Sequence, residues 1–358
     1  MKKITFPHLG NLKIPMKALF QEVGLEVVVP PDNSKKTLNL GVKHAPEHAC
    51  LPLKITLGNF IEALDKGANV IIMAGGRGPC RLGYYSEVQR EVLKNLDYDF
   101  EMCSLEPNIK KVYHNLKYLF EGISWKKVFN GFRLAFKKMF AIDKINQVVA
   151  KNRAREKEEG IINKLFEEFL TKIDRASSVR KIKKIKDTYL DSIKDSTGEF
   201  KRQIEIKLGL VGEIYMVIEP FANLEVEKKL GELGATIERE LYLSNWFLHF
   251  IKFSSDKKLK KLAEPYLKNF VGGHGIHTVG NTVKYARKNF DGVIQIGPFT
   301  FMPEMVANTV LSEVEKKEDV STLTFFMDEQ RGEAGFKTRL EAYVDLLARK
   351  KRALGKEL

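Results

Sequence analysis

The sequence predicts an α/β protein made of two Rossmann-like, doubly wound halves with parallel sheets, joined by a basic helical segment. Three observations support this fold class. Short apolar runs alternate with amphipathic helices at both ends of the chain, the middle has helical spacing with almost no Gly or Pro, and the two ends resemble each other. Uninterrupted apolar strands between amphipathic helices are typical of parallel sheets that are covered on both faces.

We expect three regions, which are an N-terminal α/β domain at 1–106, a basic helical segment at 107–195 and a C-terminal α/β domain at 196–358. In the first region, strands are expected where apolar residues run without interruption, at residues 3–8, 25–31, 69–76 and 100–107. Helices are expected where apolar residues recur at helical spacing, at residues 12–24, 51–67 and 82–96. Gly24 and Gly67 are placed to end the first two helices.

The last region is expected to alternate in the same way. Strands are expected at residues 204–215, 235–242, 292–301 and 320–330, and helices at 224–234, 302–314 and 336–351. Residues 67–83 resemble residues 290–304, since both contain a buried strand followed by a Gly- and Pro-containing loop and a helix. Doubly wound sheets bind ligands at the carboxyl ends of their strands. We therefore expect these two loops to face one cleft between the halves.

The net charge of +14 is concentrated in the middle region, where 22 Lys or Arg stand against 11 Asp or Glu and contribute +11. Such a surface favours phosphate-bearing partners, which include nucleic acid, an acidic protein and a phosphorylated cofactor such as coenzyme A. A solvated face of Lys-rich helices is the simpler interpretation. Nucleic-acid binding is disfavoured, because no RNA-binding motif with interleaved aromatic residues is present.

The sequence also predicts a cytoplasmic protein that does not associate with membranes. No apolar run reaches the roughly 18 residues that span a bilayer, and the basic N-terminus is not followed by the apolar core of a signal peptide. The chain has three cysteines, which favours a reducing compartment where thiols bind metals more often than they form disulfides.

The three cysteines have different sequence settings. Cys50 and Cys80 lie in loop-like stretches after apolar runs, and glycines and a proline around Cys80 leave its sulfur accessible. This setting suggests thiolates offered to a metal or a cluster. Cys103 lies within an expected strand, where a buried apolar cysteine is the default, with a displaced metal ligand as the alternative. His8, His48 and His274 are flanked by Gly or Pro, and we expect a hydrogen-bonded structural role for each rather than metal ligation or proton transfer.

Seven segments together resemble the 2-hydroxyacyl-CoA dehydratase D-component family, and most of all its acyl-CoA dehydratase activase-related, or CoA protein activase, branch. They are FPHLGN, HAPEHACLPLKITLGNFIEAL, MAGGRGPCRLGYYSEVQREVL, LVGEIYMVIEPFAN, GGHGIHTVGNTV, PFTFMPEMVA and DEQRGEAGFKTRLEAYVDLL. The resemblance covers both outer thirds nearly end to end and is weaker in the basic middle. It implies a subunit of two Rossmann-like halves, an acyl-CoA substrate and anaerobic chemistry.

The resemblance further implies a [4Fe-4S] cluster held by three cysteines, an ATP-dependent activator protein that supplies one electron, and pairing with a sister subunit or a second copy. In this family the electron reduces the thioester carbonyl to a ketyl radical, which expels the hydroxyl group and acidifies the β-proton. A cluster carries such redox chemistry while the protein binds and orients the substrate. Whether the present chain is itself a lyase is left open, and no catalytic residue is assigned.

Carried over to this chain, the resemblance makes Cys50 and Cys80 two of the cluster ligands. Phe301 stands where the family has its third cysteine, and His277 stands where an acidic residue is expected. We expect Phe301 to lie beside the two cysteines. The residues expected to line the cleft are His8, Glu47, Arg81, Glu213, Phe301 and Glu304.

Two functions follow from this pattern. The first is an iron–sulfur protein that transfers low-potential electrons to an acyl-CoA thioester, with a labile cluster. The second, which Phe301 favours, is a cluster-free paralogue that acts as a structural or regulatory partner of such a subunit.

Overall fold

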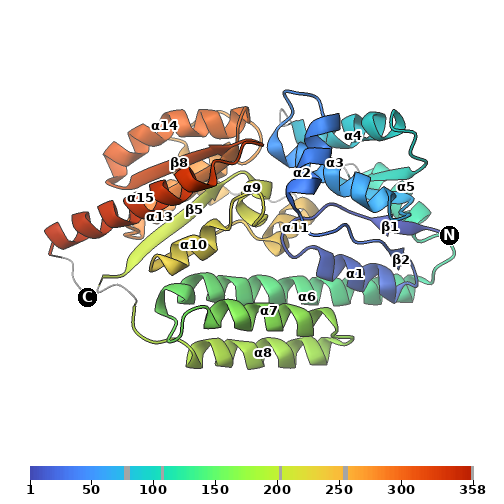
Figure 1. Ribbon diagram of the computed structural model, residues 1–358, viewed down its shortest axis with the longest axis horizontal. Coiled ribbons are helices and arrows are strands. Elements are labelled where there is room, and N and C mark those ends of the chain that lie inside the picture. Colours follow the sequence, from blue (N-terminus) through green and yellow to red (C-terminus); the bar gives the residue numbers. More distant parts are fainter. Residues whose placement is uncertain (76–80, 106–108, 201–203, 253–256, 356–358) are drawn as a thin grey trace. The chain divides into compact units, whose positions relative to one another are not determined.

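The computed structural model describes residues 1–75, 81–105, 109–200, 204–252 and 257–355, and divides into two compact units, residues 1–139 and 140–358. Each unit contains a four-stranded sheet whose neighbouring strands are all parallel, with helices packed against it (Figure 1). The predicted fold class of two doubly wound α/β halves is confirmed. Within the described residues, no helix is both long and apolar enough to cross a membrane.

The sheet of the first unit has the strand order β2-β1-β3-β4. Its strands are β1 Lys3–Thr5, β2 Glu26–Val27, β3 Val70–Ala74 and β4 Glu101–Leu105. All four were expected, but β2 contains two residues where a strand over residues 25–31 was predicted. Pairing continues only to Val28, whose N–H donates to the Ile4 carbonyl at 2.8 Å. Pro30 and Pro31 follow, and proline has no N–H with which to extend a sheet.

The helices of the first unit are α1 Lys13–Glu22, α2 Lys35–His44, α3 Leu51–Leu64, the 3₁₀ turn η1 Arg81–Tyr84, α4 Tyr85–Lys94, α5 Ile109–Leu119 and the start of α6 Trp125–Asn152. Helix α2 was not predicted. It begins with a capping box, in which the Ser34 hydroxyl accepts a hydrogen bond from the Thr37 N–H and the Thr37 hydroxyl accepts one from the Ser34 N–H. The Ser34 capping box could therefore have predicted the start of α2 from the sequence.

Alternate residues of the central strand pack on opposite faces of this sheet. Val70 and Ile72 contribute to a core that includes Cys103 and residues of α1, α5 and α6. Ile71 and Met73 contribute to a second core with residues of α3 and α4. This arrangement follows from the two-residue period of a strand, and it explains why β3 is a continuous apolar run.

The second unit repeats this design with the strand order β6-β5-β7-β8. Its strands are β5 Ile206–Gly212, β6 Ala235–Arg239, β7 Gly292–Pro298 and β8 Ser321–Met327. Its helices are the end of α6, the turn η2 Arg153–Arg155, α7 Ile161–Asp174, α8 Val179–Asp195, α9 Ile214–Ile218, α10 Val226–Glu232, α11 Leu243–Lys252, α12 Lys257–Ala263, α13 Gly275–Arg287, α14 Met302–Glu318 and α15 Glu333–Ala353. Helices α11, α12 and α13 were not predicted.

Helix α13 approaches the second sheet unusually closely. A Cβ atom built on Gly209 of β5 would lie 2.3 Å from the Tyr285 ring, so glycine is required where this ring covers the strand. Residues of α13 and α14 share one apolar core with Val211 of β5 and Val293 of β7. On α15, the Tyr343 hydroxyl donates to the Ser321 carbonyl at 2.7 Å.

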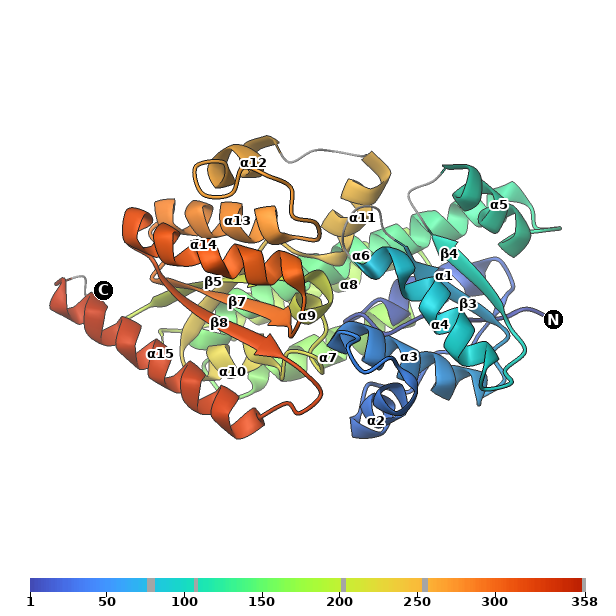
Figure 2. The same cartoon turned by 90° about the horizontal axis from the view of Figure 1, so that it is seen from above.

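The two units share an internal repeat that extends beyond the one expected from the sequence. A constant shift of 222 residues carries the start of α2 onto the start of α12 and the start of β3 onto the start of β7. The same shift carries the segment Thr56–Leu57–Gly58–Asn59 of α3 onto Thr278–Val279–Gly280–Asn281 of α13. Helix α2 packs on α3 and helix α12 packs on α13 (Figure 2). The two units are therefore two versions of one structural template.

Candidate functional site

In each sheet the order of strands reverses between the two central strands, β1 and β3 in the first unit and β5 and β7 in the second. Ligands of doubly wound sheets bind at such a reversal, at the carboxyl ends of the strands. Most of the residues that the sequence singled out follow these ends or begin the nearby helices.

Cys50 lies at the N-terminus of α3 in the first unit. It is the N-cap residue of this helix, its side chain is buried, and its thiol is hydrogen-bonded to the Tyr85 hydroxyl. Tyr85 is the first residue of α4, the helix that follows the Cys80 loop. The positive end of a helix dipole favours the thiolate over the thiol. Tyr85 is a neighbour that the sequence did not single out.

Cys103 lies on the opposite face of the same sheet from Cys50. It pairs with Ile72 in the register of β3 and β4 and packs in the core beside α1, whereas Cys50 packs in the core beside α3 and α4. Burial raises the pKa of the Cys103 thiol to about 11. The structure therefore gives Cys103 the surroundings of a buried apolar cysteine and does not bring it to Cys50.

His8 follows β1 and is held by two hydrogen bonds. Its ring Nε2 donates to the Pro30 carbonyl at 2.9 Å, and its backbone N–H donates to Asn59 Oδ1 at 3.1 Å. The side chain is buried, so these bonds fix a structural histidine. Glu47 and His48 are exposed.

Cys80 belongs to residues 76–80, which lie outside the described part of the chain, and the side chain of Arg81 is likewise not described. The expected meeting of the Cys50 and Cys80 loops therefore stays a prediction. So does the expected position of Phe301 beside them.

Two buried glutamates mark the strand reversal in the second unit. Glu213 directly follows β5 and caps α9, where its carboxylate accepts a hydrogen bond from the Met216 N–H at 3.0 Å. Glu304 lies in the first turn of α14, after β7. Its carboxylate accepts hydrogen bonds from the Thr278 hydroxyl at 2.9 Å and from Gln295 Nε2 at 2.9 Å.

Burial raises the pKa of both glutamates to about 7, and the charge of Glu213 contributes to the rise at Glu304. Groups with such pKa values can hold or release a proton near neutral pH. The sequence had marked both residues as cleft lining without a role. It had not marked Thr278 and Gln295. The match between Thr56 and Thr278 in the 222-residue repeat could have identified Thr278 from the sequence.

Phe301 is the N-cap residue of α14 and is buried, with 8% of its surface exposed. A Cβ atom built on Gly273 would lie 2.8 Å from its ring, so the Gly272–Gly273 turn before α13 leaves room for the ring. Phenylalanine offers no metal ligand. The position that the family resemblance assigns to a cysteine is thus filled by an apolar, packed side chain.

The described residues do not fit a complete iron–sulfur site. Such clusters are held by several cysteine thiolates, whereas the described residues place only Cys50 on its face of the sheet. Within the described ranges, no group of three or more His, Cys, Asp or Glu side chains is arranged to hold a metal ion.

The sequence profile of a family described as "CoA enzyme activase uncharacterised domain" matches residues 12–240. The matched range is more than half of the chain and contains Cys50, Cys80 and Glu213, whereas Phe301 and Glu304 lie beyond it. No curated protein matches the sequence.

Proposed function

The chain belongs to the CoA enzyme activase domain family, and on this premise we propose that it is one subunit of an iron–sulfur enzyme that acts on acyl-CoA thioesters. The enzyme would be of the 2-hydroxyacyl-CoA dehydratase and benzoyl-CoA reductase type. In this proposal Cys50 and Cys80 are two ligands of a [4Fe-4S] cluster that is completed by a further ligand from elsewhere, such as a sister subunit or a second copy. An ATP-dependent activator protein is the expected redox partner.

The position of Cys50 is the observation that supports this proposal most directly. Its thiol lies at the N-terminus of the 14-residue helix α3 and is hydrogen-bonded to Tyr85. Cys80 lies five positions before Tyr85 in the sequence. The thiol of Cys50 is therefore next to the helix that the Cys80 loop leads into.

Phe301 favours a second candidate, the cluster-free paralogue that acts as a structural or regulatory partner of such a subunit. Its buried ring occupies the position of the third family cysteine and cannot bind iron. Under this candidate Cys50 and Cys80 are thiols without a metal, and the chain contributes to the CoA-thioester enzyme by association alone.

Anaerobic reconstitution with iron and sulfide separates the two candidates. Iron and sulfide per chain would be measured for the wild type, Cys50→Ala, Cys80→Ala and Phe301→Cys, with Cys103→Ala as the matched control because Cys103 lies on the opposite sheet face. If the chain carries a partial site, the wild type and Cys103→Ala bind a labile cluster. Phe301→Cys then binds more iron, and Cys50→Ala and Cys80→Ala bind none.

Equal iron in all five proteins would refute the partial cluster site and leave the cluster-free partner. Folding of each variant would be checked by circular dichroism, so that a loss of iron is not confused with a loss of structure.

A further inference from the structure

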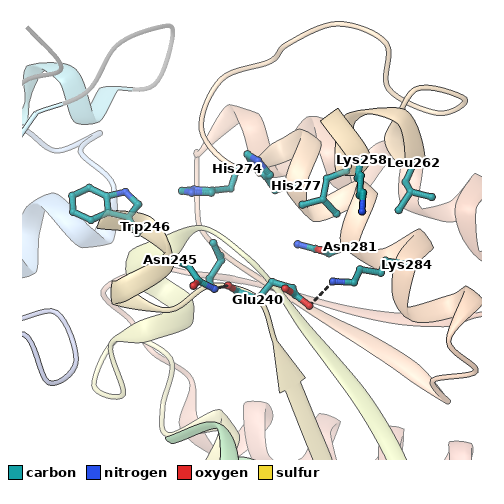
Figure 3. Close-up of a pocket in the computed structure, with 11 residues that line it drawn as sticks. Glu240, Asn245, Trp246, Lys258, Leu262, His274, His277, Asn281 and Lys284 are labelled. Carbon is teal, nitrogen blue, oxygen red and sulfur yellow. Dashed lines mark hydrogen bonds and ion pairs between the residues drawn. The ribbon is translucent and has the colours of Figure 1, made fainter. Parts of the chain in front are cut away.

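The second unit contains a cavity of about 470 Å³ beside α13, with α11 and α12 contributing to its wall (Figure 3). One face of α13 supplies four polar lining residues, His274, His277, Asn281 and Lys284. Positions three, seven and ten residues apart lie on the same side of a helix. The volume is in the range of small-molecule sites, which are about 300–1,000 Å³.

Asn281 is the residue of this wall that most directly suggests a ligand contact. Its side chain is 4% exposed, and its Oδ1 has no hydrogen-bond partner among the described residues. Figure 3 shows its amide group directed into the cavity. Buried polar atoms are almost always paired, so an unpaired amide at the cavity wall is a candidate contact for a ligand.

The equivalent residue of the first unit is hydrogen-bonded within the protein. Asn59 precedes Asn281 by the same 222 residues, and both ends of its amide are used. Its Oδ1 accepts from the His8 N–H at 3.1 Å, and its Nδ2 donates to Asn33 Oδ1 at 2.7 Å. One helix position is thus structural in the first unit and directed into a cavity in the second.

The two helix pairs differ at one close-contact position. A Cβ atom on Gly41 of α2 would lie 1.6 Å from the Lys54 carbonyl oxygen, so α2 meets α3 through this glycine. The equivalent residue of α12 is Ala263, whose Cβ atom forbids the same approach to α13. Close contact is kept at the other glycine, where a Cβ atom on Gly280 would lie 2.6 Å from the Leu259 carbonyl oxygen.

The charge of the cavity favours an anion. Glu240 is paired with Lys284, whose Nζ lies 2.6 Å from the carboxylate, so these two charges balance. Lys258 adds a positive charge from α12. His274 and His277 lie at the N-terminus of the 13-residue helix α13, with their ring centres 5.6 Å apart. The N-terminus of a helix favours phosphate and other anions.

The remaining wall is apolar and aromatic. Trp246 of α11 and three leucines, Leu241, Leu259 and Leu262, line it. An indole ring offers a flat surface on which a nucleobase can stack. The cavity thus combines an anion-binding end, an aromatic wall and an acceptor for an N–H or O–H group.

We propose that this cavity binds a nucleoside phosphate. The phosphate lies at the His274 and His277 end beside Lys258, the base lies against Trp246, and an amino or hydroxyl group of the ligand donates to Asn281 Oδ1. The same chemistry is offered by a free nucleotide and by the nucleotide end of coenzyme A. The site contains no cysteine, so its occupancy does not depend on the iron–sulfur proposal.

Isothermal titration of the full-length protein with ADP, coenzyme A and inorganic phosphate tests this proposal. ADP or coenzyme A is expected to bind with a dissociation constant below about 1 mM and at least tenfold more tightly than phosphate, because only the nucleotides reach Trp246 and Asn281. Tighter binding of ADP identifies a free nucleotide as the ligand, and tighter binding of coenzyme A identifies the nucleotide end of the cofactor.

Two matched pairs of variants locate the site. Asn281→Leu is expected to weaken nucleotide binding about tenfold without lowering the melting temperature, whereas Asn59→Leu is expected to lower the melting temperature and leave binding unchanged. Lys258→Glu is expected to weaken binding, whereas Lys261→Glu, on the same helix but outside the cavity lining, is not.

Three results would overturn the proposal. They are no binding of either nucleotide at 1 mM, equal binding of phosphate and nucleotides, and nucleotide binding that neither Asn281→Leu nor Lys258→Glu weakens. Because these measurements need no iron, they are independent of the reconstitution result.

Discussion

Replacing Glu304 with glutamine should change how the stability of the protein depends on pH. In the wild type, the buried carboxyl group of Glu304 has a pKa of about 7, compared with 4.5 for an ordinary glutamate. Between these pH values the folded protein keeps a proton that the unfolded chain releases. The folded state is therefore favoured at low pH. This contribution is fully present below pH 4.5 and is lost as the pH rises from 4.5 through 7.

The magnitude follows from the two pKa values. Each pKa unit corresponds to about 1.4 kcal/mol, so ionisation of Glu304 should cost the folded state about 3 kcal/mol above pH 7. Glu304→Gln has no carboxyl group to ionise, and its amide oxygen can still accept the hydrogen bonds from Thr278 and Gln295. The free energy of unfolding of the wild type relative to this variant should thus fall by about 2.5 kcal/mol between pH 5 and pH 8, since a small part of the effect is already lost at pH 5.

Urea denaturation followed by circular dichroism at several pH values measures this difference. Glu313→Gln is the control, because Glu313 lies on the same helix with half of its side chain exposed. Its stability should follow the wild type at every pH. Parallel curves for the wild type and Glu304→Gln between pH 5 and pH 8 would show that Glu304 does not carry a raised pKa.

Three further predictions concern packing, thiol reactivity and helix capping. In the urea assay, Gly58→Ala should lower the free energy of unfolding by about 3 kcal/mol, because its Cβ would lie 2.0 Å from the Thr37 carbonyl oxygen. Gly335→Ala lies in an open position of α15 and should raise the free energy of unfolding by about 0.5–1 kcal/mol. Cys103 should resist iodoacetamide at pH 8 until the protein unfolds. Its thiol has a pKa of about 11, so roughly one molecule in a thousand carries the thiolate at this pH. Rapid labelling of Cys103 in the folded protein, detected by mass spectrometry, would contradict its burial. Ser34→Ala should cost about 1 kcal/mol by removing the cap of α2, and an unchanged urea midpoint would show that the capping box is dispensable.

The strands were predictable because each is a short apolar run bounded by Gly, Pro or polar residues. The run around Ile71 became β3 and the run around Ile294 became β7, as the sequence indicated. Helices α11 to α13 were missed, and α13 combines its polar face with glycines and β-branched residues, which have low helix propensity. A stripe of His277, Asn281 and Lys284 resembles a solvated surface in sequence, and only the structure shows that it lines a pocket.

The candidate site was predictable only in part. Cys50, Glu213 and Glu304 were singled out from the sequence, and all three lie at helix N-termini near strand ends. Their surroundings were not predictable, since burial of a carboxyl group and the pairing of a thiol with Tyr85 depend on residues that are distant in sequence. The opposite orientation of Cys103 follows from strand register, which the sequence pattern alone left undetermined.

The helix pair α2 and α3 of the first unit recurs as α12 and α13 in the second unit, so equivalent positions can be compared within one molecule. Gly41 lets α2 approach α3 closely, whereas the equivalent position of α12 carries the methyl group of Ala263. Each unit is therefore a built-in control for the other, because a substitution on α2 or α3 can be compared with the same substitution made 222 residues later in the same molecule.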